Sequence, residues 1–222
     1  MSAAVATAET AALCLTAGSV GAMHTLLGPD HYVPFVAMAR AGGWSTAKTL
    51  RVTLACGLGH LAGSVALGIA GVAFGLAAAR FEPIESVRGA VAGWLLILGG
   101  AAVLGWGCWR AAGHRAADAS ASTGAAAAAS VWAPWAAFLV FVFGPCEPLI
   151  PLVMLPAARA SGWAVAAVIV AFGAATLATM AAAVWAMRHG AGLVRAPRLA
   201  RFADILAGLA ILACGVLVRF GL

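Results

Sequence analysis

The residues best suited to chemistry lie near the start of the chain, where His24, Asp30 and His31 flank a Gly28–Pro29 pair inside a long apolar stretch. Ionisable side chains are costly inside a membrane segment, and such residues usually mark a functional site. Imidazole nitrogen binds nickel, cobalt, copper and zinc, while a carboxylate adds negative charge that holds a divalent cation out of water. These residue types therefore point to a site for a divalent transition-metal cation.

The Gly28–Pro29 pair decides whether these side chains can meet. Proline lacks a backbone N–H and its ring collides with the preceding turn, so a helix that arrives through His24 must break near Gly28. In an unbroken helix, His24 and His31 would share a face but stand roughly 10 Å apart along the axis, too far for one ion. Because a break lets the second segment turn back, we expect Asp30 and His31 to approach His24.

His60, in the next apolar stretch, is a further candidate ligand. Thr53, Cys56, His60 and Ser64 recur at spacings of three, four and four residues, which places them on one helical face. Taken alone, His60 could equally be a structural histidine that bonds a neighbouring helix, and Asp30 could cap the helix after the break. Several such residues near one break favour the functional interpretation.

A second Gly-Pro pair, Gly144–Pro145, is followed directly by Cys146 and Glu147. We expect both side chains at the start of a half-helix, where unpaired N–H groups stabilise negative charge. Either one could complete a metal site begun by His31 and His60. The alternative is that Cys146 permits close packing and Glu147 caps the helix.

Composition defines the class of protein. Of 222 residues, 64% are hydrophobic and 9% are charged, and the mean hydropathy is +1.02. Several apolar stretches reach the roughly 20 residues that cross a bilayer. We therefore predict an all-α polytopic membrane protein with spans near residues 4–27, 46–79, 87–109, 131–143, 163–187 and 202–220. Short helical pieces should follow each Gly-Pro pair, and Gly57–Gly59 is the expected weak point of the second span.

The two halves of the chain resemble each other. Gly28–Trp44 is similar to Gly144–Trp163, and an offset of 116 residues relates the starts of these stretches as well as Gly57 to Gly173. Three spans per half is an odd number, so the copies should have opposite orientations, as in transporters with a midplane site between broken helices. We predict a first repeat over residues 1–110, a low-complexity linker over 111–130 and a second repeat over 131–222.

The positive charge is expected to set topology rather than to bind nucleic acid. The chain has 13 Lys and Arg and a net charge of +6. Nine of these residues fall on one side of the six predicted spans and four on the other. By the positive-inside rule, the first side faces the cytoplasm, and both termini lie outside it, with the chain in the plasma (inner) membrane.

The stretch from His24 to His31, together with Leu58-Gly59-His60, resembles the nickel/cobalt transporter superfamily, including its urease-accessory-like members. That family has a His-x4-Asp-His signature on one transmembrane helix and a Leu-Gly-His motif on the next. Here five residues separate His24 from Asp30. The resemblance implies that His24, Asp30, His31 and His60 belong to the path of a transported Ni²⁺ or Co²⁺ ion. We accordingly expect a carrier with no tightly bound cofactor, and not an enzyme.

Two other functions stay open at this point. The Gly-Pro-Cys sequence at Cys146 resembles the CcdA-type membrane thiol–disulfide carriers, but dithiol chemistry needs a cysteine in each half and the counterpart of Cys146 is Asp30. A non-transporting membrane accessory protein is the other alternative. The expected partners are a metal cation and the lipid bilayer, and the sequence indicates no particular protein partner.

Overall fold

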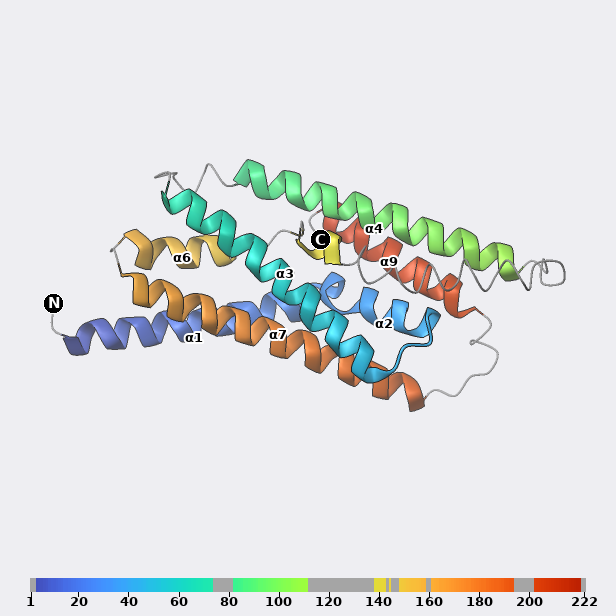
Figure 1. Ribbon diagram of the computed structural model, residues 1–222, viewed down its shortest axis with the longest axis horizontal. Helices are drawn as coiled ribbons and strands as arrows, with labels where there is room; N and C mark the ends of the chain where they lie inside the picture. The colour runs from blue at the N-terminus through green and yellow to red at the C-terminus, as the bar shows by residue number, and fades with distance from the viewer. Residues whose placement is uncertain are drawn as a thin grey trace.

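The predicted all-helical class is confirmed by the computed structural model, which describes residues 3–73, 82–111, 138–142, 144, 148–158, 161–193 and 202–220. The described elements are α1 (Ala3–Leu27), the 3₁₀ helix η1 (Pro29–His31), α2 (Val33–Ala41), α3 (Thr46–Ala73), α4 (Glu82–Ala111), α6 (Leu149–Ala158), α7 (Gly162–Leu193) and α9 (Ala203–Phe220). Residues 138–142 are also helical, and the described part of the chain contains no strand. Figure 1 shows the arrangement.

Four of these helices are long and apolar enough to cross a membrane. The qualifying segments are Thr7–Leu27, Thr46–Ala70, Ser86–Trp109 and Gly162–Gly190. Large apolar side chains on their surfaces are well exposed, as for Leu15 at 74% and Val170 at 68%. Such surfaces suit lipid rather than water, so these helices are those of an integral membrane protein. Most of the predicted linker and most of the predicted fourth span lie outside the described residues.

The predicted break after α1 is present, and so is the stop after α2. The first long helix ends at Leu27, Gly28 is extended, and η1 leads into α2. At the far end of α2, Gly43 has a positive φ of 61°, a conformation that glycine adopts without steric cost. The chain then turns into α3, which begins at Thr46.

The predicted weak point at Gly57–Gly59 is wrong, because α3 is continuous through it. The two glycines serve packing instead. A Cβ on Gly57 would lie 2.6 Å from Leu177 of α7, and one on Gly59 would lie 2.7 Å from the ring of Phe138. Close approach of neighbouring helices, rather than a bend, therefore accounts for glycine at both positions.

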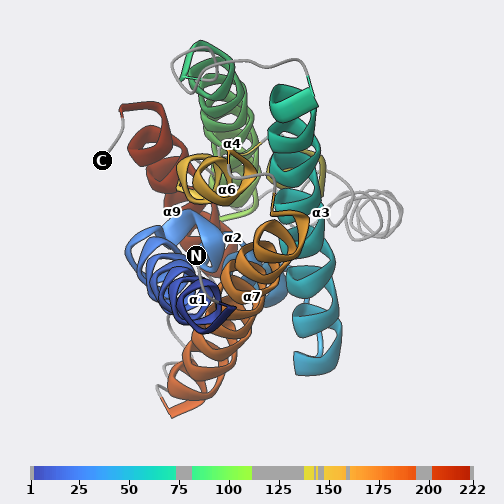
Figure 2. The same cartoon turned by 90° about the vertical axis from the view of Figure 1, so that its left-hand side faces the viewer.

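The helices form two long pairs with the short helices between them. Helix α1 packs along α7, and α4 packs along α9, while α3 crosses α7 and α2 contacts α3, α7 and α9. Figure 1 shows α4 and α9 along one side of the molecule and α1 and α7 along the other, and Figure 2 shows the same separation from the end. Side chains that face inward from both pairs meet near the break after α1.

The α4–α9 pair is held together by glycines at seven-residue intervals. Gly93 and Gly100 on α4 lie against α9, and Gly208 and Gly215 on α9 lie against α4. A Cβ on Gly215 would stand 2.6 Å from the backbone nitrogen of Ile97. Spacing by seven keeps small residues on one face of a supercoiling pair, and their size lets the two backbones approach closely.

This packing predicts different effects for two neighbouring substitutions. In Gly100→Ala the new methyl group would overlap the backbone of Leu212, whereas no described atom lies within 4 Å of a Cβ on Gly99. We expect Gly100→Ala to lower the free energy of unfolding in detergent by about 1–3 kcal/mol. Gly99→Ala should change it by less than about 0.5 kcal/mol. Equal unfolding curves for the two variants would contradict the described interface.

Candidate metal centre

Three histidines from three different elements meet between the two helix pairs. His24 comes from α1, His31 from η1 and His60 from α3, and one candidate ligand nitrogen from each lies within 4.8 Å of the other two. The ring centroids of His24 and His31 are 4.8 Å apart, and those of His31 and His60 are 5.4 Å apart. His31 and His60 are each only 3% exposed. The group is a buried cluster of imidazoles.

The break after α1 brings His24 and His31 together, as the sequence predicts. Gly28 ends the α-helical turn by donating its N–H to the carbonyl of His24, and the single 3₁₀ turn then places His31 beside His24. There is no room for a side chain at Gly28, because a Cβ there would lie 2.7 Å from Nδ1 of His31 and 2.9 Å from Oδ1 of Asp30. Glycine is required at this break by close packing against the site itself.

The face of α3 that carries His60 is buried. Thr53, Cys56, His60 and Ser64 are each between 0% and 3% exposed. Thr53 donates its hydroxyl to the carbonyl of Thr49 in its own helix, so its polar group is satisfied locally. His60 is different, because its ring reaches across to another element.

His31 and His60 each form a hydrogen bond between one ring nitrogen and a backbone carbonyl. Nδ1 of His60 lies 3.1 Å from the carbonyl oxygen of Phe141, and Nδ1 of His31 lies 3.2 Å from that of Gly28. A carbonyl only accepts hydrogen bonds, so each Nδ1 carries a proton, and in the neutral imidazole each Nε2 then presents its lone pair. Metal-binding histidines are commonly held by this kind of outer contact, which fixes the tautomer and the ring orientation.

The opposite ring nitrogens have no partner in the part of the chain that the structure describes. Nε2 of His24, His31 and His60 is buried in each case and has no hydrogen-bond partner among the described residues. A buried polar atom left unpaired costs about 1–3 kcal/mol. Three such atoms on neighbouring rings are difficult to explain as structural histidines, whereas a shared cation would supply the missing partners.

Asp30 lies behind His31 rather than among the three nitrogens. Its Oδ2 is 3.3 Å from Nδ1 of His31, and its side chain is 28% exposed. A carboxylate in this position orients the imidazole and makes Nε2 a stronger donor to a metal. The structure therefore places the predicted ligand Asp30 next to the site, in contact with a candidate ligand.

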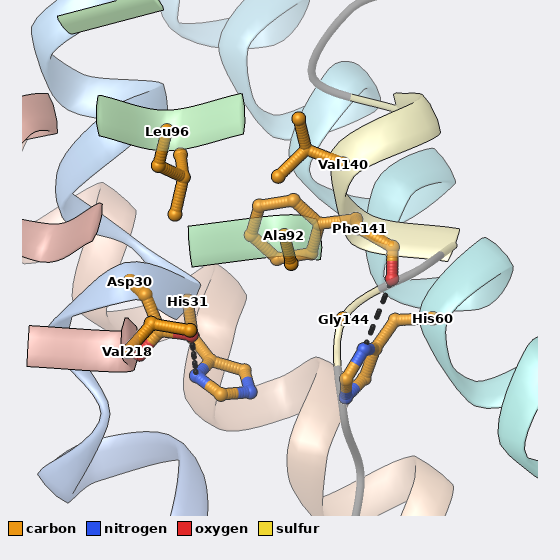
Figure 3. Close-up of a pocket in the computed structure, with 9 residues that line it drawn as sticks. All are labelled: Asp30, His31, His60, Ala92, Leu96, Val140, Phe141, Gly144 and Val218. Atoms are coloured by element: carbon orange, nitrogen blue, oxygen red, sulfur yellow. Dashed lines mark hydrogen bonds and ion pairs between the residues drawn. The ribbon is translucent and has the colours of Figure 1, made fainter. Parts of the chain in front are cut away.

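A small cavity of about 20 Å³ adjoins the cluster, enough for roughly one water molecule. Figure 3 shows the rings of His31 and His60 on facing sides of this cavity, with Phe141 above them. Asp30 lines it as well, and the remaining wall is apolar side chains from α4, α9 and residues 138–144. The cavity thus places a polar, ion-sized space where the two helix pairs meet.

The spacing of the cluster is looser than that of a closed metal site. Two nitrogens bound tetrahedrally to one ion at about 2.0–2.1 Å lie roughly 3.3 Å apart. The candidate nitrogens lie within 4.8 Å of one another, so the widest pair would close by up to roughly 1.5 Å on binding. Because the three rings belong to separate elements, modest ring rotations and backbone shifts can supply this movement.

The other predicted ligands, Cys146 and Glu147, lie outside the described residues, and so does Pro145. Their neighbour Gly144 is described, and a Cβ on it would lie 3.3 Å from Nδ1 of His60. Gly144, the first residue of the second Gly-Pro pair, is therefore adjacent to the candidate metal centre. Sequence reasoning missed the carbonyls of Gly28 and Phe141, because backbone acceptors leave no pattern in side-chain types.

Comparison of the chain with protein-family models, with curated proteins and with solved structures finds no match.

The close contact at Gly28 leads to a prediction about metal binding. Gly28→Ala should displace His31 and Asp30 and weaken the binding of Co²⁺ to the purified protein by at least about tenfold, as for loss of an outer contact to a ligand. Gly18→Ala on α1 is the matched control, since the Cβ there would meet only the carbonyl of Ala171, at 3.9 Å, among the described atoms. Unchanged Co²⁺ affinity in correctly folded Gly28→Ala protein would contradict the described geometry.

Proposed function

We propose that this protein is a membrane transporter of a divalent transition-metal cation, and that the cation is nickel or cobalt in preference to other metals. The observation that carries the proposal is a cluster of three histidines in which one ring nitrogen of each lies within 4.8 Å of the other two, and in which each Nε2 is buried without a hydrogen-bond partner in the described part of the chain. Imidazole nitrogen suits nickel and cobalt well, and three neutral ligands add no charge of their own. The nearby carboxylate of Asp30 offsets part of the charge of the cation.

The looseness of the cluster favours transport over permanent metal storage. A transported ion must bind well enough to enter and weakly enough to leave. A site that has to contract on binding, and that adjoins a cavity between two helix pairs, meets both requirements better than a closed four-ligand cage. His60 also lies well inside the span Thr46–Ala70, where a site for alternating access is expected.

The arrangement of elements supports an inverted repeat of two three-span halves. Helices α2 and α6 begin 116 residues apart, and so do α3 and α7, which is the offset between the two Gly-Pro pairs. In Figure 1 the two short helices α2 and α6 lie on opposite sides of the molecular centre. These relations favour six spans, with residues 131–143 and α9 completing the second half, and a site between the two breaks.

The α4–α9 contacts have the reciprocity that a twofold relation requires. Gly100 meets Leu212, and Gly215 meets Ile97. A shift of 115 in residue number relates Ile97 to Leu212 and Gly100 to Gly215. The contact of Gly100 with Leu212 therefore corresponds to the contact of Gly215 with Ile97. The same shift relates the contact of Gly93 with Arg219 to that of Gly208 with Leu104.

The proposal includes the resemblance to the nickel/cobalt transporter superfamily and the placement in the plasma membrane with both termini outside the cytoplasm. The contact between the rings of His24 and His31 shows that the extra residue in the first motif still lets its two histidines meet. The thiol–disulfide alternative draws no support from the described cysteines, Cys14, Cys56, Cys108 and Cys214, which are all free thiols. A non-transporting accessory protein would use the same cluster to bind metal without moving it.

Metal content of cells tests transport directly. Cells that express the protein should differ in Ni²⁺ or Co²⁺ content from cells without it, with higher content for import and lower content for export. His31→Ala should remove this difference, because it deletes the central ring of the cluster. Asp30→Asn should reduce the transport rate by about 10–100-fold, as expected for loss of an orienting contact.

His189→Ala is the matched control, because His189 is exposed and its ring lies beside Trp185 of its own helix. It should transport like the wild type. Undiminished transport by His31→Ala at equal membrane abundance would reject the site. Metal binding without any effect of the protein on cell content would support the accessory role instead.

A further inference from the structure

Arg88 links helix α4 to the backbone beside the candidate metal centre. Its Nη2 donates hydrogen bonds to the carbonyl oxygens of Val142, at 3.0 Å, and of Gly144, at 3.1 Å. An arginine near the start of the apolar span Ser86–Trp109 is costly unless it has such partners. These two carbonyls belong to the second break, where the helical bonding of residues 138–142 ends and leaves acceptors unpaired.

The same stretch of backbone holds His60. The carbonyl of Phe141 accepts from Nδ1 of His60, at 3.1 Å, and from the N–H of Gly144, also at 3.1 Å. Arg88 therefore binds the carbonyls of Val142 and Gly144, while His60 binds the carbonyl of Phe141 in the same short segment. A movement of this segment would alter the contact that sets the tautomer of His60.

Helix α3 leaves the segment little room to move on its other side. A Cβ on Gly63 would lie 2.9 Å from the carbonyl oxygen of Val142 and 3.3 Å from Nη2 of Arg88, and one on Gly59 would lie 2.9 Å from Cγ2 of Val142. The segment is thus held between the surface of α3 and the guanidinium of Arg88.

We propose that Arg88 is a positioning residue of the metal centre: it fixes residues 141, 142 and 144 so that the carbonyl of Phe141 keeps the proton of His60 on Nδ1 and leaves the lone pair on Nε2. A planar guanidinium has donors in a fixed geometry and can hold two acceptors at once, whereas the ammonium of lysine is a flexible point charge. His31 is an internal reference, since the partners of its Nδ1 among the described residues are Gly28 and Asp30, which lie outside the segment that Arg88 holds.

The importance of Arg88 rests on the proposed function, but its effect on His60 needs no metal. The experiment therefore reads the protonation of the ring nitrogens by ¹⁵N NMR, in metal-free protein in lipid bilayers at a pH where imidazole is neutral. Single histidine substitutions assign the signals. The variants are Arg88→Gln, Arg88→Lys and, as a matched control, Arg51→Gln, because Arg51 is exposed and, within the described residues, donates a hydrogen bond from Nε to the carbonyl of Ala47 in its own helix.

In the wild type and in Arg51→Gln, we expect His60 and His31 to be protonated on Nδ1. In Arg88→Gln, the ratio of the Nδ1–H to the Nε2–H form of His60 should fall at least tenfold while that of His31 stays unchanged, and Arg88→Lys should be intermediate. An unchanged ratio for His60 in folded Arg88→Gln would overturn the proposal. Equal changes in His31 and His60 would also overturn it, because they would indicate general disruption.

If Arg88→Gln fails to fold, Arg88→Lys and Gly63→Ala test the proposal instead. The methyl group of Gly63→Ala would press on the carbonyl of Val142, which Arg88 also contacts. A change confined to His60 in either variant supports the proposal, and no change in both overturns it. Co²⁺ titration supplies the second readout: affinity should fall by about 10–100-fold in Arg88→Gln and stay at the wild-type value in Arg51→Gln. Absence of Co²⁺ binding by the wild type would reject the proposed function. The NMR spectra alone would then test whether Arg88 positions His60.

Discussion

The candidate site depends on hydrogen bonds between imidazole Nδ1 atoms and backbone carbonyls. The carbonyls of Gly28 and Phe141 face the Nδ1 atoms of His31 and His60, and this leaves each Nε2 with its lone pair directed into a buried space. Hydrogen-bond acceptors of this kind become available where a helix ends, because carbonyls of the last turn lose their partners. A broken helix therefore supplies both the turn that gathers the ligands and the contacts that orient them.

The surrounding packing explains why the break can be kept at little cost. Gly28 admits Asp30 and His31 against the chain, and glycines on α3 admit the segment that carries Phe141. The α4–α9 pair, packed through its own glycines, carries Arg88 and closes one side of the cavity beside the cluster. Small residues thus act as spacers that let polar groups meet in an otherwise apolar protein.

Much of the fold and part of the site follow from the sequence. Hydropathy and the Gly28–Pro29 pair predict α1, the break and the approach of His31 to His24, since proline excludes a continuous helix. The three- and four-residue spacing around His60 predicts that these residues share one face of α3, and the structure adds that this face is buried. Gly57 and Gly59 are misjudged because glycine permits either a bend or close packing, and only the neighbouring helix decides between them. The roles of Arg88 and of the Phe141 carbonyl depend on contacts between distant parts of the chain, which no local pattern encodes.

X-ray absorption by bound cobalt tests the three-histidine centre most directly. Purified protein loaded with one equivalent of Co²⁺ should show nitrogen at about 2.0–2.1 Å, with the outer-shell scattering of three imidazole rings. Single substitution of His24, His31 or His60 by alanine should remove one ring from that signal. An all-oxygen environment, or a spectrum that none of the three substitutions changes, would contradict a metal site built on these histidines.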